Sequence, residues 1–279
     1  MDVDVIYCGD ASRMVEVEDG SVQLVVTSPP YNVGKAYEAP IENGRHLENL
    51  DGYLTFLGTV WEECVRVLCQ GGRLAINIAS TWRQPYIPLH SLITNQLLGL
   101  GLIMRGEIIW DKGASAGVST AWGSFARASN PTLRDVHEYI LVFSKGTLKL
   151  ESREKSSGIA NQDFVDWTRS IWRFPTESSQ RVKHPAPFPE ELPRRLILLY
   201  TNQGDLVLDP FMGSGTTAQA ASREGRHYVG YDNDPAYCLA ARQRLSGIQT
   251  SLPSIGTDGV KASKPARSRQ GKLGLSRSP

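Results

Sequence analysis

The segment Leu206–Ala221, LVLDPFMGSGTTAQAA, has residue types that could bind a charged ligand through the backbone. An apolar run is followed by a glycine-rich turn and a helical pattern. A helix N-terminus presents unpaired N–H groups and the positive end of the helix dipole, and glycines let a ligand come close. We interpret the segment as a cofactor loop; a ligand-free, close-packed turn is the alternative. No lysine follows the second glycine, which argues against a Walker loop.

Two acidic residues near this loop bear on which cofactor it binds. The run Gly213–Ala218 fits the GxGxxG/A pattern of dinucleotide enzymes, and Asp232 follows at nearly the distance of their ribose-binding acid. Asp209, however, would repel a diphosphate and could hold an ammonium, while Asp232 could bind two ribose hydroxyls. S-adenosylmethionine has both groups. We expect this cofactor, with a nicotinamide dinucleotide as the alternative.

A second candidate site is the segment Val22–Asn32, VQLVVTSPPYN, an apolar strand pattern that ends at two prolines. Successive prolines stop a strand and fix its backbone. In open α/β sheets ligands bind beyond the carboxyl ends of the strands, so Ser28 and Tyr31 would lie on the cofactor's side. A plain turn with a packed tyrosine is the alternative.

The elements that must position these segments alternate between short apolar runs and helical patterns, which indicates an α/β domain with a mainly parallel sheet. Gly71-Gly72 is expected to end the first helix. The predicted helices are Asp51–Cys69 and three more that follow Pro189, Gly215 and Pro235. The predicted strands are Val3–Cys8, Val22–Thr27, Arg73–Ile78, Ile103–Trp110, Glu138–Phe143, Asp205–Leu208 and His227–Tyr231.

Composition excludes several classes of protein. The chain has 279 residues, 41% hydrophobic and 21% charged, which suits one large globular domain. The longest nearly apolar stretch, Leu92–Met104, is too short to span a bilayer, and the acidic start MDVDVIYCGD has no export signal. We therefore expect a cytoplasmic protein. The four cysteines form no CxxC pair, so we expect free thiols and no metal site.

Charge and composition divide the chain. Residues 250–279 carry six basic residues against Asp258 and are poor in aromatics, so we expect a disordered basic tail, which leaves a net charge of −4 on residues 1–249. Within 1–249, the segments 113–134 and 149–183 show weak periodicity and are typical of irregular loops that carry recognition. Their candidate contacts are Arg127, Arg134, Arg153, Arg169, Arg173, Arg181, Trp122, Phe125, Trp167 and Trp172.

Taken together, TSPPYN and DPFMGSGTT resemble the SPPY/DPPY and FxGxG motifs of the S-adenosylmethionine-dependent DNA amino methyltransferases. The proline motif comes first, as in the β class. IYCGDA, EIIWDKG, VHEYILVFSK and HPAPFPEELPRRLI also match, so the resemblance covers about residues 5–245. It implies a Rossmann-like methyltransferase fold: a mostly parallel twisted sheet with helices on both faces, circularly permuted motif order, and irregular target-recognition insertions.

The resemblance also implies roles for individual residues. In the Ser28-Pro29-Pro30-Tyr31 motif, the Ser28 hydroxyl and the Pro29 carbonyl accept the two hydrogens of an exocyclic amine, and Tyr31 stacks on the flipped base. Around the cofactor, the implied residues are Asp10 on the adenine amine, Asp232 on the ribose, and Asp209, Phe211, Gly213 and Gly215 on the methionine portion. Asp10 could instead cap a helix, Phe211 could belong to the core, and Thr216 and Thr217 could bind the carboxylate or start a helix.

The implied activity is methylation of double-stranded DNA by a modification enzyme or a solitary methylase. Within the family, serine at position 28 is associated with cytosine N4, and aspartate with adenine N6, which stays the alternative. A cognate restriction endonuclease is a possible partner, and the chain would be a monomer or homodimer. Three further readings stay open: a nicotinamide-dependent oxidoreductase, a non-catalytic nucleic-acid binder, and methylation of RNA or protein.

Overall fold

The computed structural model describes residues 1–30, 50–79, 86–116, 123–151, 156–176 and 188–249. These residues form an eight-stranded sheet in the order β1-β8-β7-β2-β3-β5-β4-β6. Every neighbouring pair is parallel except those of β5, which runs opposite to the other strands. The strands are β1 Val5–Cys8, β2 Val22–Thr27, β3 Leu68–Ile78, β4 Ile103–Asp111, β5 His137–Ser144, β6 Ile171–Arg173, β7 Leu206–Asp209 and β8 His227–Asp232.

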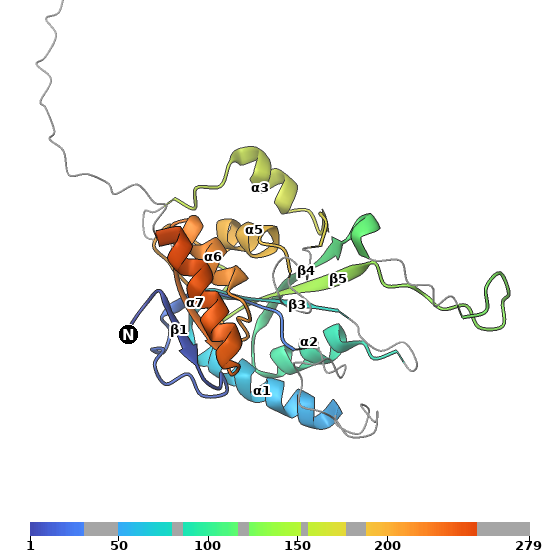
Figure 1. Cartoon of the computed structure of the whole chain (residues 1–279), viewed down its shortest axis with the longest axis horizontal. Helices are drawn as coiled ribbons and strands as arrows, with labels where there is room; N and C mark the ends of the chain where they lie inside the picture. The colour runs from blue at the N-terminus through green and yellow to red at the C-terminus, as the bar shows by residue number, and fades with distance from the viewer. Residues whose placement is uncertain (31–49, 80–85, 117–122, 152–155, 177–187, 250–279) are drawn as a thin grey trace, which may run out of the picture.

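Helices cover both faces of this sheet (Figure 1). On one face lie α1 (Leu50–Val67) and α2 (Leu89–Gly99). On the other lie α5 (Glu191–Tyr200), α6 (Thr216–Arg223) and α7 (Pro235–Gln249), with α3 (Asn161–Trp167) packed beyond α5. A short 3-10 helix, η3 (Gly113–Ala116), follows β4. No helix within the described ranges is both long and apolar enough to cross a membrane.

Alternating strand residues build one hydrophobic core on each face of the sheet. Val25, Leu74 and Ile76 pack with α1 and α2, whereas Leu24 and Val26 pack with the helices of the opposite face. Helix α1 turns the apolar side predicted from its three- and four-residue spacing toward the sheet, burying Tyr53, Leu57, Val60, Trp61, Cys64 and Val67. These cores confirm the predicted α/β fold.

The order of the strands brings distant parts of the chain together. Strand β7 pairs with β2, and β8 pairs with β1, so the two predicted motifs become neighbours although they lie near opposite ends of the chain. Because β1, β2, β3, β7 and β8 are parallel, their carboxyl ends meet at one edge of the sheet. Ligands of open α/β sheets bind at such an edge.

Two local predictions are wrong. Gly71-Gly72 does not end α1: the helix ends at Val67, and β3 starts at once. Gly71 has φ +72° and donates its N–H to the Lys145 carbonyl at 2.8 Å; a Cβ there would lie 2.1 Å from the Lys149 carbonyl oxygen. The missing side chain of Gly71 therefore lets the backbone at Lys149 pass close to β3. The segment 149–183 is not wholly irregular, because it contains α3 and β6, and β6 extends the sheet beside β4.

Candidate active site

A buried carboxylate connects the two predicted motifs. Asp209, the last residue of β7, is 2% exposed. Its Oδ1 accepts a hydrogen bond from the Thr27 hydroxyl at 2.7 Å and from the Phe211 N–H at 3.1 Å, and its Oδ2 accepts one from the Thr217 hydroxyl at 2.6 Å. The ends of β2 and β7 and the first turn of α6 are thus held by a single side chain.

Burial also changes the acidity of this carboxylate. Loss of solvent raises the pKa of Asp209 to about 6, while the hydrogen bonds from Thr217, Thr27 and Phe211 oppose the rise. The charge of Asp232 acts in the same direction as burial. The pKa of Asp209 therefore lies well above the usual value of an aspartate, and a positive charge near it would favour its ionised form.

The glycine loop takes the conformation expected for a strand-to-helix turn. Gly213 has φ +52° and Gly215 has φ +85°, a backbone region that favours glycine. A Cβ on Gly215 would lie 2.9 Å from the Ala241 Cβ of α7. Gly215 immediately precedes α6, so the turn leads directly to the helix N-terminus, as predicted.

Asp232 lies at the end of β8 and fixes this loop from the other side. Its Oδ2 accepts the Gly213 N–H at 2.8 Å, and its Oδ1 accepts the Asp234 N–H at 2.9 Å. Burial raises the pKa of Asp232, and these two backbone bonds oppose the rise. The main-chain carbonyl of Asp232 accepts the Gly9 N–H at 2.9 Å, so the end of β1 lies next to it.

Asp10 follows this end of β1 in an exposed turn. Its carboxylate accepts hydrogen bonds from the N–H and the hydroxyl of Ser12 at 2.9 and 2.8 Å. The segment after Asp10 is not helical, so helix capping, the alternative role considered for Asp10, is wrong. The structure therefore brings Asp10 to the same edge as Asp232 and leaves its carboxylate at the surface.

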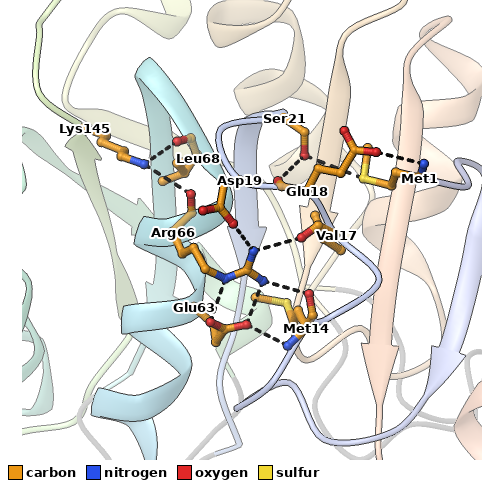
Figure 2. A network of polar contacts seen from close by, with 10 residues as sticks. All are labelled: Met1, Met14, Val17, Glu18, Asp19, Ser21, Glu63, Arg66, Leu68 and Lys145. Atoms are coloured by element: carbon orange, nitrogen blue, oxygen red, sulfur yellow. Dashed lines mark hydrogen bonds and ion pairs between the residues drawn. The ribbon is translucent and has the colours of Figure 1, made fainter.

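An arginine of α1 fixes the loop that follows Asp10 (Figure 2). The Arg66 guanidinium donates to the carbonyls of Met14 and Val17 at 2.8 and 3.0 Å and pairs with Asp19 and Glu63. Glu63 also accepts the Met14 N–H, and the bond from Arg66 holds the pKa of the Glu63 carboxyl below its usual value. The loop between β1 and β2 is therefore anchored to the first helix.

The remaining predicted cofactor residues are divided between this edge and the core. The Phe211 ring is half-buried and packs against Phe56 and Trp61, with centroids 6.0 and 6.2 Å away. The Thr216 hydroxyl accepts a hydrogen bond from Arg244 at 3.0 Å. Because Thr217 is bonded to Asp209, both threonine hydroxyls have partners within the protein. Thr216 and Thr217 are also the first two residues of α6.

The proline motif follows β2 at the same edge. Ser28 is half-buried and comes directly after Thr27; Pro29 is buried. The Pro30 carbonyl accepts a hydrogen bond from the Tyr53 hydroxyl of α1 at 2.9 Å. Tyr31, predicted to stack on the base, lies outside the described residues. Thr27 and Tyr53 are not among the predicted site residues, although a threonine directly before the motif was a signal for the first.

Several residues of the predicted recognition segments are structural. Trp167 and Trp172 are buried, and Trp110 stacks on Phe174 with centroids 5.1 Å apart. The Arg195 guanidinium of α5 lies 4.8 to 5.3 Å from the ring centroids of Trp167, Trp172 and Phe174. Exposed Arg173 pairs with Asp111 of β4 at 2.7 Å. Trp122, Arg153 and Arg181 lie outside the described residues.

The geometry fits S-adenosylmethionine. Two glycines with positive φ keep side chains away from the turn before α6. The Asp232 carboxylate suits a diol, whereas Asp209, which is buried with both oxygens bonded within the protein, can act on an ammonium only through its charge. Two carboxylates at neighbouring strand ends also disfavour a diphosphate. The glycines and carboxylates that these two features need are all present in the chain.

Comparison with known proteins agrees with this fit. A family model described as a DNA methylase matches residues 22–243. The Type II methyltransferase M.MjaI of Methanocaldococcus jannaschii is 33% identical over 263 residues, which cover 82% of this chain and 86% of that protein. The DNA adenine methyltransferase YhdJ of Escherichia coli is 29% identical over 261 residues, covering 86% and 82%.

Comparison with solved structures also identifies a DNA methylase. A Thermus thermophilus structure, described as a DNA modification methylase complexed with S-adenosyl-L-methionine, has a TM-score of 0.72 at 31% identity and covers 88% of this chain and 95% of that one. These matches identify S-adenosylmethionine as the cofactor in place of a nicotinamide dinucleotide. The chain therefore belongs to the S-adenosylmethionine-dependent DNA amino methyltransferases, the family that modifies cytosine N4 or adenine N6.

Proposed function

We propose that the chain methylates the exocyclic N4 amine of a flipped cytosine in double-stranded DNA. The observation that carries this proposal is the position of Ser28. It follows Thr27 at the end of β2, and the Thr27 hydroxyl bonds the buried carboxylate at the end of the cofactor strand. The base-binding motif and the cofactor loop are thereby held in one rigid arrangement.

The residues of the motif orient the amine. An exocyclic amine is a poor nucleophile because its lone pair is delocalised into the ring. The Ser28 hydroxyl and the Pro29 carbonyl accept its two hydrogens and aim the lone pair at the methyl group, which the cofactor supplies. The bond from Tyr53 to the Pro30 carbonyl fixes the backbone of this motif. The acceleration then comes chiefly from positioning.

Tyr31 stabilises the flipped base in this proposal. Flipping costs a few kcal/mol. Stacking on an aromatic ring returns roughly 1–3 kcal/mol. Tyr31 therefore offsets much of the cost of taking the cytosine out of the duplex.

The cofactor occupies the edge formed by β1, β7 and β8. Asp10 accepts from the adenine amine, and Asp232 binds the ribose hydroxyls while it holds the Gly213 N–H. Phe211, Gly213 and Gly215 surround the methionine portion. Asp209 acts there through charge and through the bonds that fix Thr27 and Thr217.

The identity of the methylated base, cytosine or adenine, is the most specific part of the proposal. Serine at position 28, in a family where aspartate accompanies adenine, favours cytosine. Adenine N6 is the second candidate, because the relative from Escherichia coli is named a DNA adenine methyltransferase.

Sequence recognition falls to the segments 113–134 and 149–183, through arginines such as Arg127 and Arg134 that could contact bases or phosphates. Relatives named Type II methyltransferases support a role in a restriction-modification system. A cognate restriction endonuclease would be the other enzyme of that system. We propose a monomer or homodimer, with residues 250–279 adding a salt-dependent attraction to DNA.

The test is to incubate the protein with methyl-labelled S-adenosylmethionine and unmethylated DNA of mixed sequence, digest the DNA to nucleosides and separate them by chromatography. Label in N4-methylcytosine would support the proposal. Label in N6-methyladenine would keep the mechanism and overturn the base. No label in DNA, with cofactor binding demonstrated, would overturn the DNA substrate.

A further inference from the structure

A polar chain of three side chains lies beside the proline motif, at the carboxyl ends of β3 and β4. The Asn77 Nδ2 donates to a carboxylate oxygen of Glu138, and the other oxygen of Glu138 accepts from the Lys112 ammonium at 2.8 Å. All three are largely covered: Asn77 is 2% exposed, and the Glu138 and Lys112 side chains are 12% and 16% exposed. Such a network is costly to bury unless its polar atoms have partners.

The register of the sheet brings Asn77 next to Ser28. Ile76 pairs with Thr27 in the parallel strands β3 and β2, and Asn77 and Ser28 are the next residues of each chain segment. Neighbouring strands lie about 4.8 Å apart. Ala75 and Val26 share the core on the α5 face, so alternation places Asn77 and Ser28 on that face too.

Glu138 determines which way the Asn77 amide points. An ionised carboxylate only accepts hydrogen bonds and the Lys112 ammonium only donates them. The amide must therefore turn its NH₂ group to Glu138 and its oxygen away. That oxygen is buried and, within the described part of the chain, accepts no hydrogen bond. Buried acceptors are almost always satisfied in native proteins, so this oxygen calls for a donor.

We propose that the Asn77 carbonyl shares with the Ser28 hydroxyl one of the two hydrogens of the target base's exocyclic amine, in a three-centre hydrogen bond, with Glu138 as the residue that positions Asn77 and Lys112 as the residue that fixes Glu138. This inference rests on the proposed function and adds a selection rule to it. An oriented acceptor favours a base with an amine and disfavours one with a carbonyl at the same place. The network would thus select cytosine over uracil when the base enters the pocket.

Two single variants test the orientation directly. Asn77→Leu removes the acceptor, and kcat/KM for the DNA site should fall at least about tenfold with unchanged cofactor affinity. In Glu138→Gln the Lys112 ammonium holds the new amide oxygen, so the new NH₂ group donates toward position 77. Asn77 must then reverse and present its own NH₂ group to the base. This variant should lose a similar factor, and its preference for binding a duplex with cytosine over uracil at the target should fall at least about tenfold.

The double variant Asn77→Asp/Glu138→Gln separates orientation from packing. The new glutamine donates to the aspartate, whose second oxygen again presents an acceptor, so most of the lost kcat/KM should return. A double variant no more active than Glu138→Gln, or an unchanged preference for cytosine over uracil, would overturn the inference.

Gln96→Leu is the matched control. The Gln96 Oε1 is also buried and unsatisfied among the described residues, but it lies on α2, where the amide binds the Leu54 carbonyl. This variant should keep wild-type kinetics, and activity loss equal to that of Asn77→Leu would contradict a specific role. Wild-type protein that labels no DNA would overturn the proposed function as well, whereas labelled DNA with unaffected Asn77 and Glu138 variants overturns only this inference.

Discussion

The Thr27 hydroxyl donates a 2.7 Å hydrogen bond to the Asp209 carboxylate, across 182 positions of sequence. One residue ends the strand that carries the proline motif, and the other ends the strand that carries the glycine loop. Because Thr217 binds the second carboxylate oxygen, a change in the charge of Asp209 affects both motifs. The buried carboxylate is therefore the point where pH should act on this enzyme.

We expect Asp209 to reduce stability as pH rises. Burial raises its pKa from 3.8 to about 6, so between these values the folded chain binds more protons than the unfolded chain. The free energy of unfolding should fall over this interval by up to about 3 kcal/mol from this group. Asp209→Asn should remove that component, measured as the difference from wild type in urea unfolding between pH 4 and 8. Equal pH dependence in both proteins would contradict the assignment.

The elements around this contact were largely predictable. Helix α1 was predicted at Asp51–Cys69 and spans Leu50–Val67, because its apolar spacing is regular. The glycine loop also follows from local signals, since Gly213 and Gly215 precede a helical run. The contact between Thr27 and Asp209 was not predictable, because it depends on β7 pairing with β2.

Other features were missed for identifiable reasons. Helix α2 was not predicted, because Thr94, Asn95 and Gln96 interrupt its apolar pattern. Strand β6 is only three residues long, and its sequence Ile-Trp-Arg does not alternate between apolar and polar residues, because the apolar Ile171 is exposed. The orientation of Asn77 depends on Glu138 and Lys112, which reach it only after β5 pairs with β3 and β4. For β6 and for the orientation of Asn77, long-range strand pairing decides the outcome, not local preference.

Tyr53→Phe should reduce turnover more than cofactor binding. The lost hydroxyl donates to the Pro30 carbonyl at 2.9 Å, so the variant loosens the motif that holds the amine. The loss in stability should be about 1 kcal/mol. Steady-state kinetics and calorimetric titration with S-adenosylmethionine would separate the two effects. Thr59→Ala, on the exposed side of the same helix, is the control; equal kinetics of Tyr53→Phe and wild type would contradict the positioning role.

Gly215→Ala and Gly225→Ala form a matched pair. Both glycines have positive φ, +85° and +72°, so each alanine should cost about 1–2 kcal/mol of stability. Only the first also places a Cβ 2.9 Å from the Ala241 Cβ, which forces α7 or the loop to move; at Gly225 the nearest atom is 4.0 Å away. Weaker cofactor binding is expected for Gly215→Ala alone. Equal cofactor affinities of the two variants would show that the loop tolerates the shift.

Asp232→Ala and Asp234→Ala separate the cofactor loop from helix capping. Asp232 holds the Gly213 N–H, whereas the Asp234 carboxylate accepts the Ala236 N–H at 2.8 Å at the start of α7. Asp234→Ala should therefore cost about 1 kcal/mol of stability and leave cofactor affinity unchanged.

Asp232→Ala should weaken binding of S-adenosylmethionine and of its demethylated product to the same extent, because the ribose is common to both. Losing charge-assisted bonds to two hydroxyls predicts at least about a tenfold rise in Kd. Calorimetry with both ligands measures this directly. A loss confined to S-adenosylmethionine would assign Asp232 to the charged end of the cofactor, and unchanged affinity for both ligands would remove it from the site.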